Sequence, residues 1–84
     1  PHYLRTSDGY EIDLILQVRR KLWAIEVKLT SDPAPQDLAR LDKAADWIGA
    51  DHRALVSKVP VSAMGSRTSS CTLPDLIARL IRGD

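Results

Sequence analysis

Two short stretches of the sequence place acidic side chains where a small domain would normally place neutral ones. Glu11 and Asp13 lie in the run GYEIDLIL, and Glu26 and Lys28 lie in the run AIEVKL. Both runs alternate charged with apolar residues, which predicts two β-strands whose successive side chains point to opposite faces. If the two strands pair as a hairpin, Asp13, Glu26 and Lys28 share one face and lie close together.

The chemistry that this set would support is metal-assisted hydrolysis of a phosphodiester. Two carboxylates roughly 5 Å apart repel by about 3 kcal/mol at an effective dielectric constant near 20, so a cation must offset them. Lys28 is one candidate, and Mg²⁺ or Mn²⁺ held by Asp13 and Glu26 is the other, because these ions accept carboxylate oxygens and water. A magnesium ion polarises a phosphoryl oxygen and lowers the pKa of a bound water, while a neighbouring lysine orients that water.

The same face also has a simpler interpretation. Charged residues commonly alternate along the solvent-exposed side of an antiparallel sheet, where Glu–Lys cross-strand pairs add a few tenths of a kcal/mol. However, aspartate is disfavoured in strand interiors, yet Asp13 falls mid-strand and its partner segment has the order acid-x-lysine. The pattern therefore favours a site, with a wet sheet face as the alternative.

The rest of the pattern predicts the elements that position these residues, in the order β-β-β-α-β-α. Strands are predicted at residues 3–6, 10–18, 22–29 and 52–59, a loop at residues 60–70, and helices at residues 36–49 and 72–82. These elements predict one α/β domain over residues 1–84, with a mixed β-sheet, an antiparallel hairpin core and flanking helices. Trp23 and Trp47 fall on apolar faces of their elements, which predicts that both pack in the core.

The turn of the hairpin decides which residue faces Asp13. A two-residue turn at Arg19-Arg20 pairs Asp13 with Glu26, and a four-residue loop pairs it with Lys28. Two arginines are a poor two-residue turn, so the sequence favours the longer loop.

Composition limits the partners and the location. Twelve basic residues nearly balance eleven acidic ones, so DNA binding would need a local patch, and Arg19, Arg20 and Lys21 at the hairpin tip are a weak candidate. We find no apolar run that could cross a membrane and no signal-peptide pattern, and the single Cys71 cannot form an internal disulfide. We therefore expect a cytoplasmic protein with no membrane partner.

The order of acidic residues and lysine resembles the PD-(D/E)XK nuclease superfamily. Its active site carries an aspartate on one strand and (Asp/Glu)-x-Lys on the next, and Asp13, Glu26 and Lys28 match these positions. Glu11 matches an accessory acidic residue found in some branches. The resemblance implies a restriction-endonuclease-like fold, Mg²⁺ or Mn²⁺ on Asp13 and Glu26, and DNA cleavage that Lys28 assists.

Two polar residues follow the motif strand at the start of the first helix. A nuclease could place a polar side chain here over the scissile phosphate, which makes Gln36 an accessory candidate. The simpler interpretation is that Gln36 and Asp37 serve the helix start, where an early carboxylate favours the helix dipole.

The layout RTSDGYEIDLIL, then AIEVKLTSDPAPQDL and a helix, also resembles the domain of unknown function that follows the AAA-type ATPase in many bacterial and archaeal proteins. This resemblance implies that the chain is the C-terminal part of a longer ATPase, with ATP bound only in the preceding part. The alternative is a non-catalytic module that binds a second copy of itself or the ATPase domain of the same chain. An exposed apolar surface on the last helix would support it, formed by Leu76, Ile77, Leu80 and Ile81.

Overall fold

The structure is a computed structural model that describes the backbone of residues 2–7 and 11–83 and the side chains of residues 13–83. Within these residues it contains six strands and two helices. In chain order they are β1 (His2–Ser7), β2 (Glu11–Val18), β3 (Lys21–Lys28), α1 (Pro35–Ile48), β4 (His52–Val56), β5 (Ala63–Met64), β6 (Thr68–Cys71) and α2 (Leu73–Arg82). Neither helix in this part of the chain is long and apolar enough to cross a membrane.

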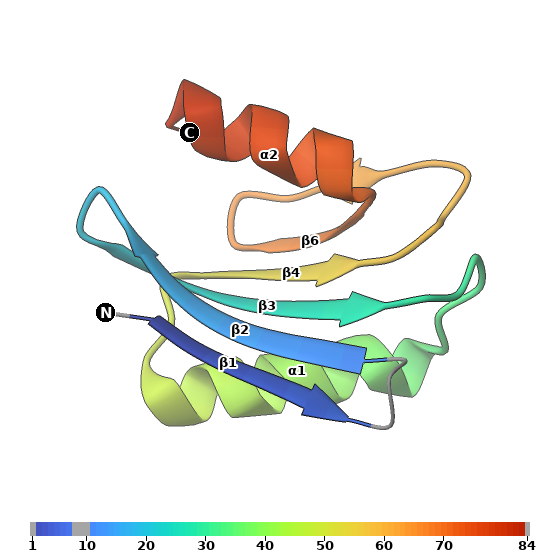
Figure 1. The fold of residues 1–84 in the computed structure, drawn as a ribbon, viewed down its shortest axis with the longest axis horizontal. Coiled ribbons are helices and arrows are strands. Elements are labelled where there is room, and N and C mark those ends of the chain that lie inside the picture. Colours follow the sequence, from blue (N-terminus) through green and yellow to red (C-terminus); the bar gives the residue numbers. More distant parts are fainter. Residues whose placement is uncertain (1, 8–10, 84) are drawn as a thin grey trace.

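The strands form one mixed sheet in the order β1-β2-β3-β4-β6-β5. Strands β1, β2 and β3 pair antiparallel, β3, β4 and β6 run parallel, and β5 pairs antiparallel with β6. Figure 1 shows α1 crossing one side of the sheet and α2 lying beside β4 and β6. The predicted α/β class, with a hairpin core and flanking helices, is confirmed.

Each helix covers a different face of the sheet. Trp23 and Ile25 of β3 pack with Leu76 of α2, whereas Ala24 packs with Leu41 and other residues of α1. This division follows from the alternation of side chains along β3. The face that carries Glu26 is therefore covered by α1, and at this residue the alternative of a solvent-exposed sheet face is wrong.

The hairpin between β2 and β3 closes with a two-residue turn, so the preference for a four-residue loop is wrong. Arg19 and Arg20 both adopt the left-handed conformation, with φ of 49° and 67°, which costs an L-residue about 1 kcal/mol or more. The Arg19 guanidinium donates hydrogen bonds to the carbonyls of Leu80 (2.7 Å) and Ile81 (3.2 Å) in the last turn of α2. These bonds and the negative end of the helix dipole help to offset the strain of the turn.

The segment 60–70 was predicted as a loop but contains two strands, β5 and most of β6. Its small polar residues carry little strand signal of their own. The buried guanidinium of Arg79 on α2 orders it, donating hydrogen bonds to the Ser66 carbonyl (3.1 Å), the Ser69 hydroxyl (2.9 Å) and the Gly65 carbonyl. Hydrogen bonds from α2 thus determine the structure of this segment.

The two helices lie within two residues of their predicted positions. Proline at the first turn and a left-handed glycine after the last turn bound each helix: Pro35 and Gly49 for α1, Pro74 and Gly83 for α2. The fourth strand is shorter than predicted, because β4 ends at Val56. The connection between the first two predicted strands falls largely on residues 8–10, which lie outside the described residues.

Only one of the two tryptophans is in the core. Trp23 is 3% exposed, as predicted, but Trp47 is 90% exposed. The apolar stripe of α1 consists of Leu38, Leu41 and Ala45, and Trp47 lies on the other side of the helix. The prediction of a core position for Trp47 is therefore wrong.

Candidate functional site

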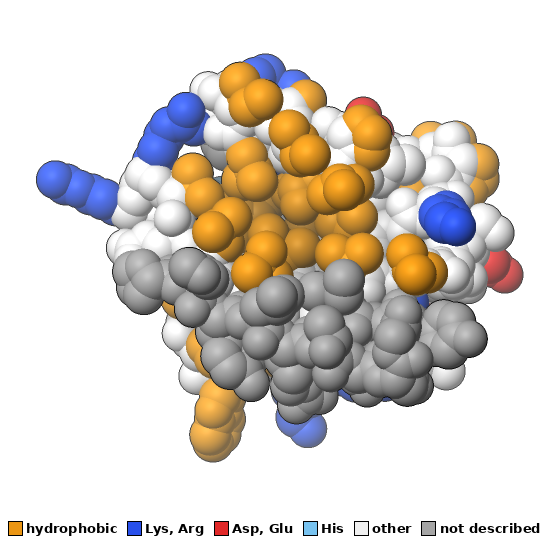
Figure 2. Space-filling view, viewed as in Figure 1, with side chains coloured by type: hydrophobic (Ala, Val, Ile, Leu, Met, Phe, Trp, Pro, Cys, Tyr) orange, Lys and Arg blue, Asp and Glu red, His pale blue; other side chains and the backbone are white. Residues whose placement is uncertain are grey.

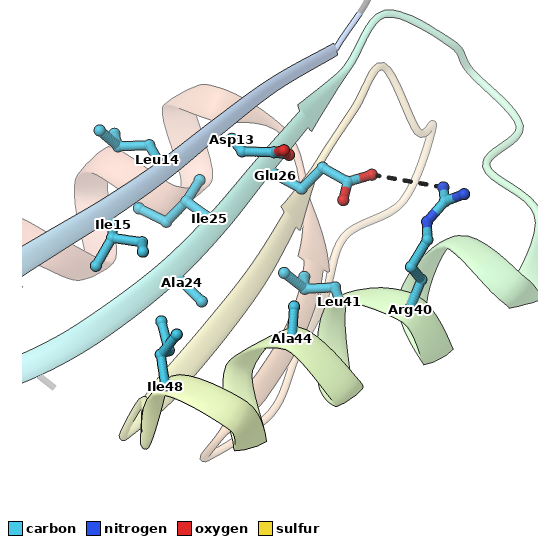
Figure 3. Close-up of a pocket in the computed structure, with 10 residues that line it drawn as sticks. All are labelled: Asp13, Leu14, Ile15, Ala24, Ile25, Glu26, Arg40, Leu41, Ala44 and Ile48. Carbon is cyan, nitrogen blue, oxygen red and sulfur yellow. Dashed lines mark ion pairs between the residues drawn. The ribbon is translucent and has the colours of Figure 1, made fainter. Parts of the chain in front are cut away.

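Asp13 and Glu26 are direct cross-strand partners on neighbouring strands. Both line a cavity of about 380 Å³ between β2, β3 and α1, with Arg40 completing its charged part. In Figure 3 the two carboxylates lie side by side, and Glu26 extends toward Arg40. The remaining lining is apolar and comprises Leu14, Ile15, Ala24, Ile25, Leu41, Ala44 and Ile48.

The two carboxylates differ in their exposure to water. Glu26 is 7% exposed because α1 packs over it, and its Oε2 lies 4.0 Å from Nη2 of Arg40. Asp13, on the strand farther from α1, is half-buried. A buried carboxylate needs a compensating positive charge, so Glu26 makes this end of the cavity a place where cations are favoured.

Asp37 is also a member of this site, although the sequence favoured a role for it at the start of the helix. Its carboxylate is buried and accepts three hydrogen bonds: Oδ1 from Lys28 Nζ (2.6 Å) and Arg40 Nη2 (2.7 Å), and Oδ2 from the Ala34 backbone N–H (2.8 Å). The hydrogen bond from Lys28 is the main reason that the pKa of Asp37 lies below its ordinary value of 3.8. Asp37 therefore caps the N-terminus of α1 and also holds the Lys28 ammonium in place.

A signal for this second role exists in the sequence. Only residues 29–34 separate β3 from α1, so the first turn of the helix must lie close to the end of the strand. A carboxylate in that turn can then reach the lysine at the strand end. Connection length, rather than residue type, carries this information.

The structure brings Asp13, Glu26 and Lys28 to one face but does not add every other candidate. Glu11 is the cross-strand partner of Lys28, and its side chain lies outside the described residues. Gln36 is exposed on the first turn of α1 and is not among the residues that line the cavity.

The basic residues of the hairpin tip lie far from the acidic pair. Six residues of extended chain separate Asp13 from Arg19, which corresponds to about 20 Å along the strand. Arg20 and Lys21 are exposed, whereas Arg19 binds the end of α2. Among the described side chains, Arg40 is a cation that does reach the acidic pair, through Glu26, and sequence reasoning did not single it out.

The donor set fits a hard divalent cation. Mg²⁺ commonly binds through one or two carboxylates and keeps water or substrate oxygens as its other ligands. Asp13 and Glu26 would supply two carboxylates. Among the described side chains, no group of three or more His, Cys, Asp or Glu residues is arranged to hold a metal ion. The remaining ligands would therefore be water, backbone carbonyls or a substrate.

Comparison with known families matches residues 1–67 to a domain of unknown function, DUF4143. The matched residues include β1, β2, β3, α1 and β4, and with them the whole cavity and its acidic pair. Neither the curated proteins nor the solved structures contain a match to the chain. Because the matched residues make up well over half of the sequence, this chain belongs to the DUF4143 family.

Proposed function

We propose that this domain binds Mg²⁺ or Mn²⁺ through Asp13 and Glu26 and hydrolyses phosphodiester bonds of DNA, assisted by Lys28. The observation that carries the proposal is the cross-strand pair of Asp13 and Glu26 at a cavity, with Lys28 on the same face of β3 and its ammonium bound to Asp37. The resemblance of these three residues to the PD-(D/E)XK motif adds support. From the resemblance in layout, we also propose that the domain acts in the cytoplasm as the C-terminal part of an AAA-type ATPase.

Each residue of the set has a role that follows from its position. When bound, the metal ion would polarise a phosphoryl oxygen and lower the pKa of a bound water. Lys28 would orient that water and neutralise charge that develops on the phosphate. Asp37 acts through Lys28 as a positioning residue, because its hydrogen bond restricts a flexible ammonium group to one place. The apolar residues that line the rest of the cavity would lower the local dielectric constant and so strengthen these interactions.

Metal binding is the first test of this function. We expect Mn²⁺ at a hundred times its dissociation constant to add about 2.7 kcal/mol to the free energy of unfolding. That corresponds to a rise in melting temperature of roughly 10 to 20 °C for a domain of this size. The Asp13→Asn variant should lose this rise, because the ion loses one of its two carboxylate ligands. The melting temperature is followed by circular dichroism as Mn²⁺ is titrated.

The matched control is Asp75→Asn, which removes an exposed carboxylate on α2, away from the cavity, and should keep the full rise. An unchanged melting temperature of the unaltered chain, or an equal rise in Asp13→Asn, would refute the metal site.

Cleavage is then measured with plasmid DNA and Mg²⁺. The Lys28→Ala variant is expected to lose about 10²- to 10³-fold in rate, as is typical when one group that stabilises developing charge is removed.

A second candidate function is favoured by an apolar surface that α2 leaves open. Leu73, Ile77 and Ile81 on this helix are 50%, 46% and 71% exposed. Figure 2 shows hydrophobic side chains gathered over α2 and the strands beside it. They adjoin the half-buried apolar residues of the sheet and helix that pack on the core, Leu14, Leu16, Val18, Val27 and Leu80. Contiguous apolar surfaces of this kind commonly mark an interface.

We propose that a second copy of the chain covers this surface. In a twofold arrangement, the stripe of Leu73, Ile77 and Ile81 would pack against the same stripe of the other copy, because a twofold interface brings one surface patch against itself. The domain would then also act as a dimerisation module.

The Ile81→Glu variant tests this arrangement, because it buries an unpaired carboxylate in the proposed interface. We expect the dissociation constant of the dimer to rise about tenfold or more, measured by sedimentation equilibrium. Trp47→Glu, which removes a still more exposed apolar side chain from α1, should leave the dimer intact. A monomeric unaltered chain, or equal effects of both variants, would argue against the dimer.

A further inference from the structure

Arg40 lies between two buried carboxylates at the mouth of the cavity. Its Nη2 is 2.7 Å from Oδ1 of Asp37 and 4.0 Å from Oε2 of Glu26. Its side chain is 59% exposed, whereas those of Asp37 and Glu26 are only 6% and 10% exposed. The guanidinium therefore approaches both carboxylates from the solvent side, and Figure 3 shows its ion pair with Glu26.

The guanidinium of Arg40 and a divalent cation would compete for the same cluster of carboxylates. Arg40 contacts Glu26 and Asp37, and Glu26 is one of the two carboxylates proposed to hold the metal ion. Two cations at neighbouring carboxylates repel each other, so each lowers the affinity of the other.

Of the two positive side chains, Arg40 is the one that can leave. Lys28 is only 24% exposed and donates a 2.6 Å hydrogen bond to Asp37 from the end of a central strand. Arg40 is exposed, reaches Glu26 only at the distance limit of an ion pair, and shares its short contact to Asp37 with Lys28. A long arginine side chain on a helix surface can rotate toward solvent without disturbing the core.

We propose that Arg40 is the resident counter-ion of this cluster, that a divalent cation displaces it, and that the released guanidinium then binds a phosphate of the nucleic acid. The inference rests on the proposed metal site. A guanidinium is well suited to the second role, because its planar set of N–H donors matches phosphate oxygens. Arg40 thus couples metal binding to substrate binding: its guanidinium balances the carboxylates before the metal ion binds, and it binds the phosphate afterwards.

Calorimetric titration with Mn²⁺ alone tests the first half of the proposal. We expect Arg40→Gln to bind Mn²⁺ about fourfold or more tightly than the unaltered chain, since a unit charge about 5 Å away contributes at least this factor in water. Arg40→Lys keeps the charge and should bind within about twofold of the unaltered chain. Lys43→Gln removes an exposed cation one turn along α1 and should leave the affinity unchanged. The gain of Arg40→Gln should shrink at high salt.

Binding of a short DNA duplex, followed by fluorescence anisotropy with and without Ca²⁺, tests the second half. Arg40→Gln should weaken DNA binding when the divalent ion is present and have little effect in its absence, when the guanidinium is engaged with the carboxylates. Lys43→Gln should change DNA binding equally in both conditions, because that side chain has no competing partner in the cluster. Circular dichroism of each metal-free variant establishes that it is folded.

The possible outcomes separate this inference from the proposed function. If neither the unaltered chain nor Arg40→Gln binds Mn²⁺, the metal site itself is refuted, and the counter-ion role is refuted with it. If the unaltered chain binds Mn²⁺ through Asp13 while Arg40→Gln binds equally or more weakly, the metal site stands and the counter-ion role is overturned. An effect of Arg40→Gln on DNA binding that is the same with and without the ion would overturn the release step.

Discussion

Replacement of Trp23 by alanine is expected to unfold this domain. The indole is 3% exposed, stacks on the His52 ring with centroids 4.5 Å apart, and lies 5.4 Å from the Arg79 guanidinium. Truncation of a buried tryptophan typically costs about 3 to 5 kcal/mol, which approaches the whole stability of about 4 to 13 kcal/mol expected at this chain length. Urea denaturation followed by circular dichroism measures the loss.

Trp47→Ala is the matched control, because it deletes the same side chain from a position that is 90% exposed. Its free energy of unfolding should lie within about 0.5 kcal/mol of that of the unaltered chain. Equal losses in the two variants would mean that the core is not organised around Trp23. A fully folded Trp23→Ala protein with unchanged stability would lead to the same conclusion.

The second large effect is expected at Asp37. Asp37→Ala should lower the free energy of unfolding by about 3 kcal/mol, because it removes the buried carboxylate that accepts the 2.6 Å hydrogen bond from the Lys28 ammonium and the hydrogen bond from the Ala34 N–H. Asp32→Ala, which removes an exposed carboxylate from the connection that precedes α1, should have little effect. Both changes are measured by urea denaturation at pH 6. A loss in Asp37→Ala no greater than that in Asp32→Ala would contradict the anchoring role.

The pH dependence of Asp37 gives an independent measurement. Its pKa in the folded state is lowered below the ordinary 3.8, chiefly by the hydrogen bond from Lys28, so its contribution is complete above the unfolded pKa. As the pH falls below about 4 toward the folded pKa, the unfolded chain takes up this proton first and the contribution is lost. The stability difference between the unaltered chain and Asp37→Ala should therefore shrink between pH 6 and pH 3. A difference that is constant with pH would show that Asp37 does not act through its charge.

Several features of the site follow from local sequence alone. The alternation in residues 11–18 and 21–28 determines which side chains share a face, and it places Asp13, Glu26 and Lys28 together with either a two-residue turn or a four-residue loop. The prolines and glycines that bound the helices act through their own backbone preferences. Side-chain alternation and helix capping depend on residues only a few positions apart, so both can be predicted from the sequence without knowledge of the fold.

Other features depend on partners that are distant in sequence. The register that pairs Asp13 with Glu26 requires a strained turn, and Arg19 in that turn binds carbonyls on α2 that lie 61 and 62 residues away. Likewise, Arg79 of α2 orders the segment that forms β5 and β6. Local turn and strand preferences opposed both outcomes, and long-range hydrogen bonds overcame them.

The sequence by itself thus determined the elements, their faces and the set of acidic residues and lysine on one face. Only the tertiary structure decided that α1 covers that face and that Trp47 remains in solvent. It also decided the two contacts of the site, in which Asp37 binds Lys28 and Arg40 forms an ion pair with Glu26. The physical reason is that burial and ion pairing depend on which surfaces meet. That choice is made by the packing of the whole chain, whereas alternation and capping are settled within a few residues.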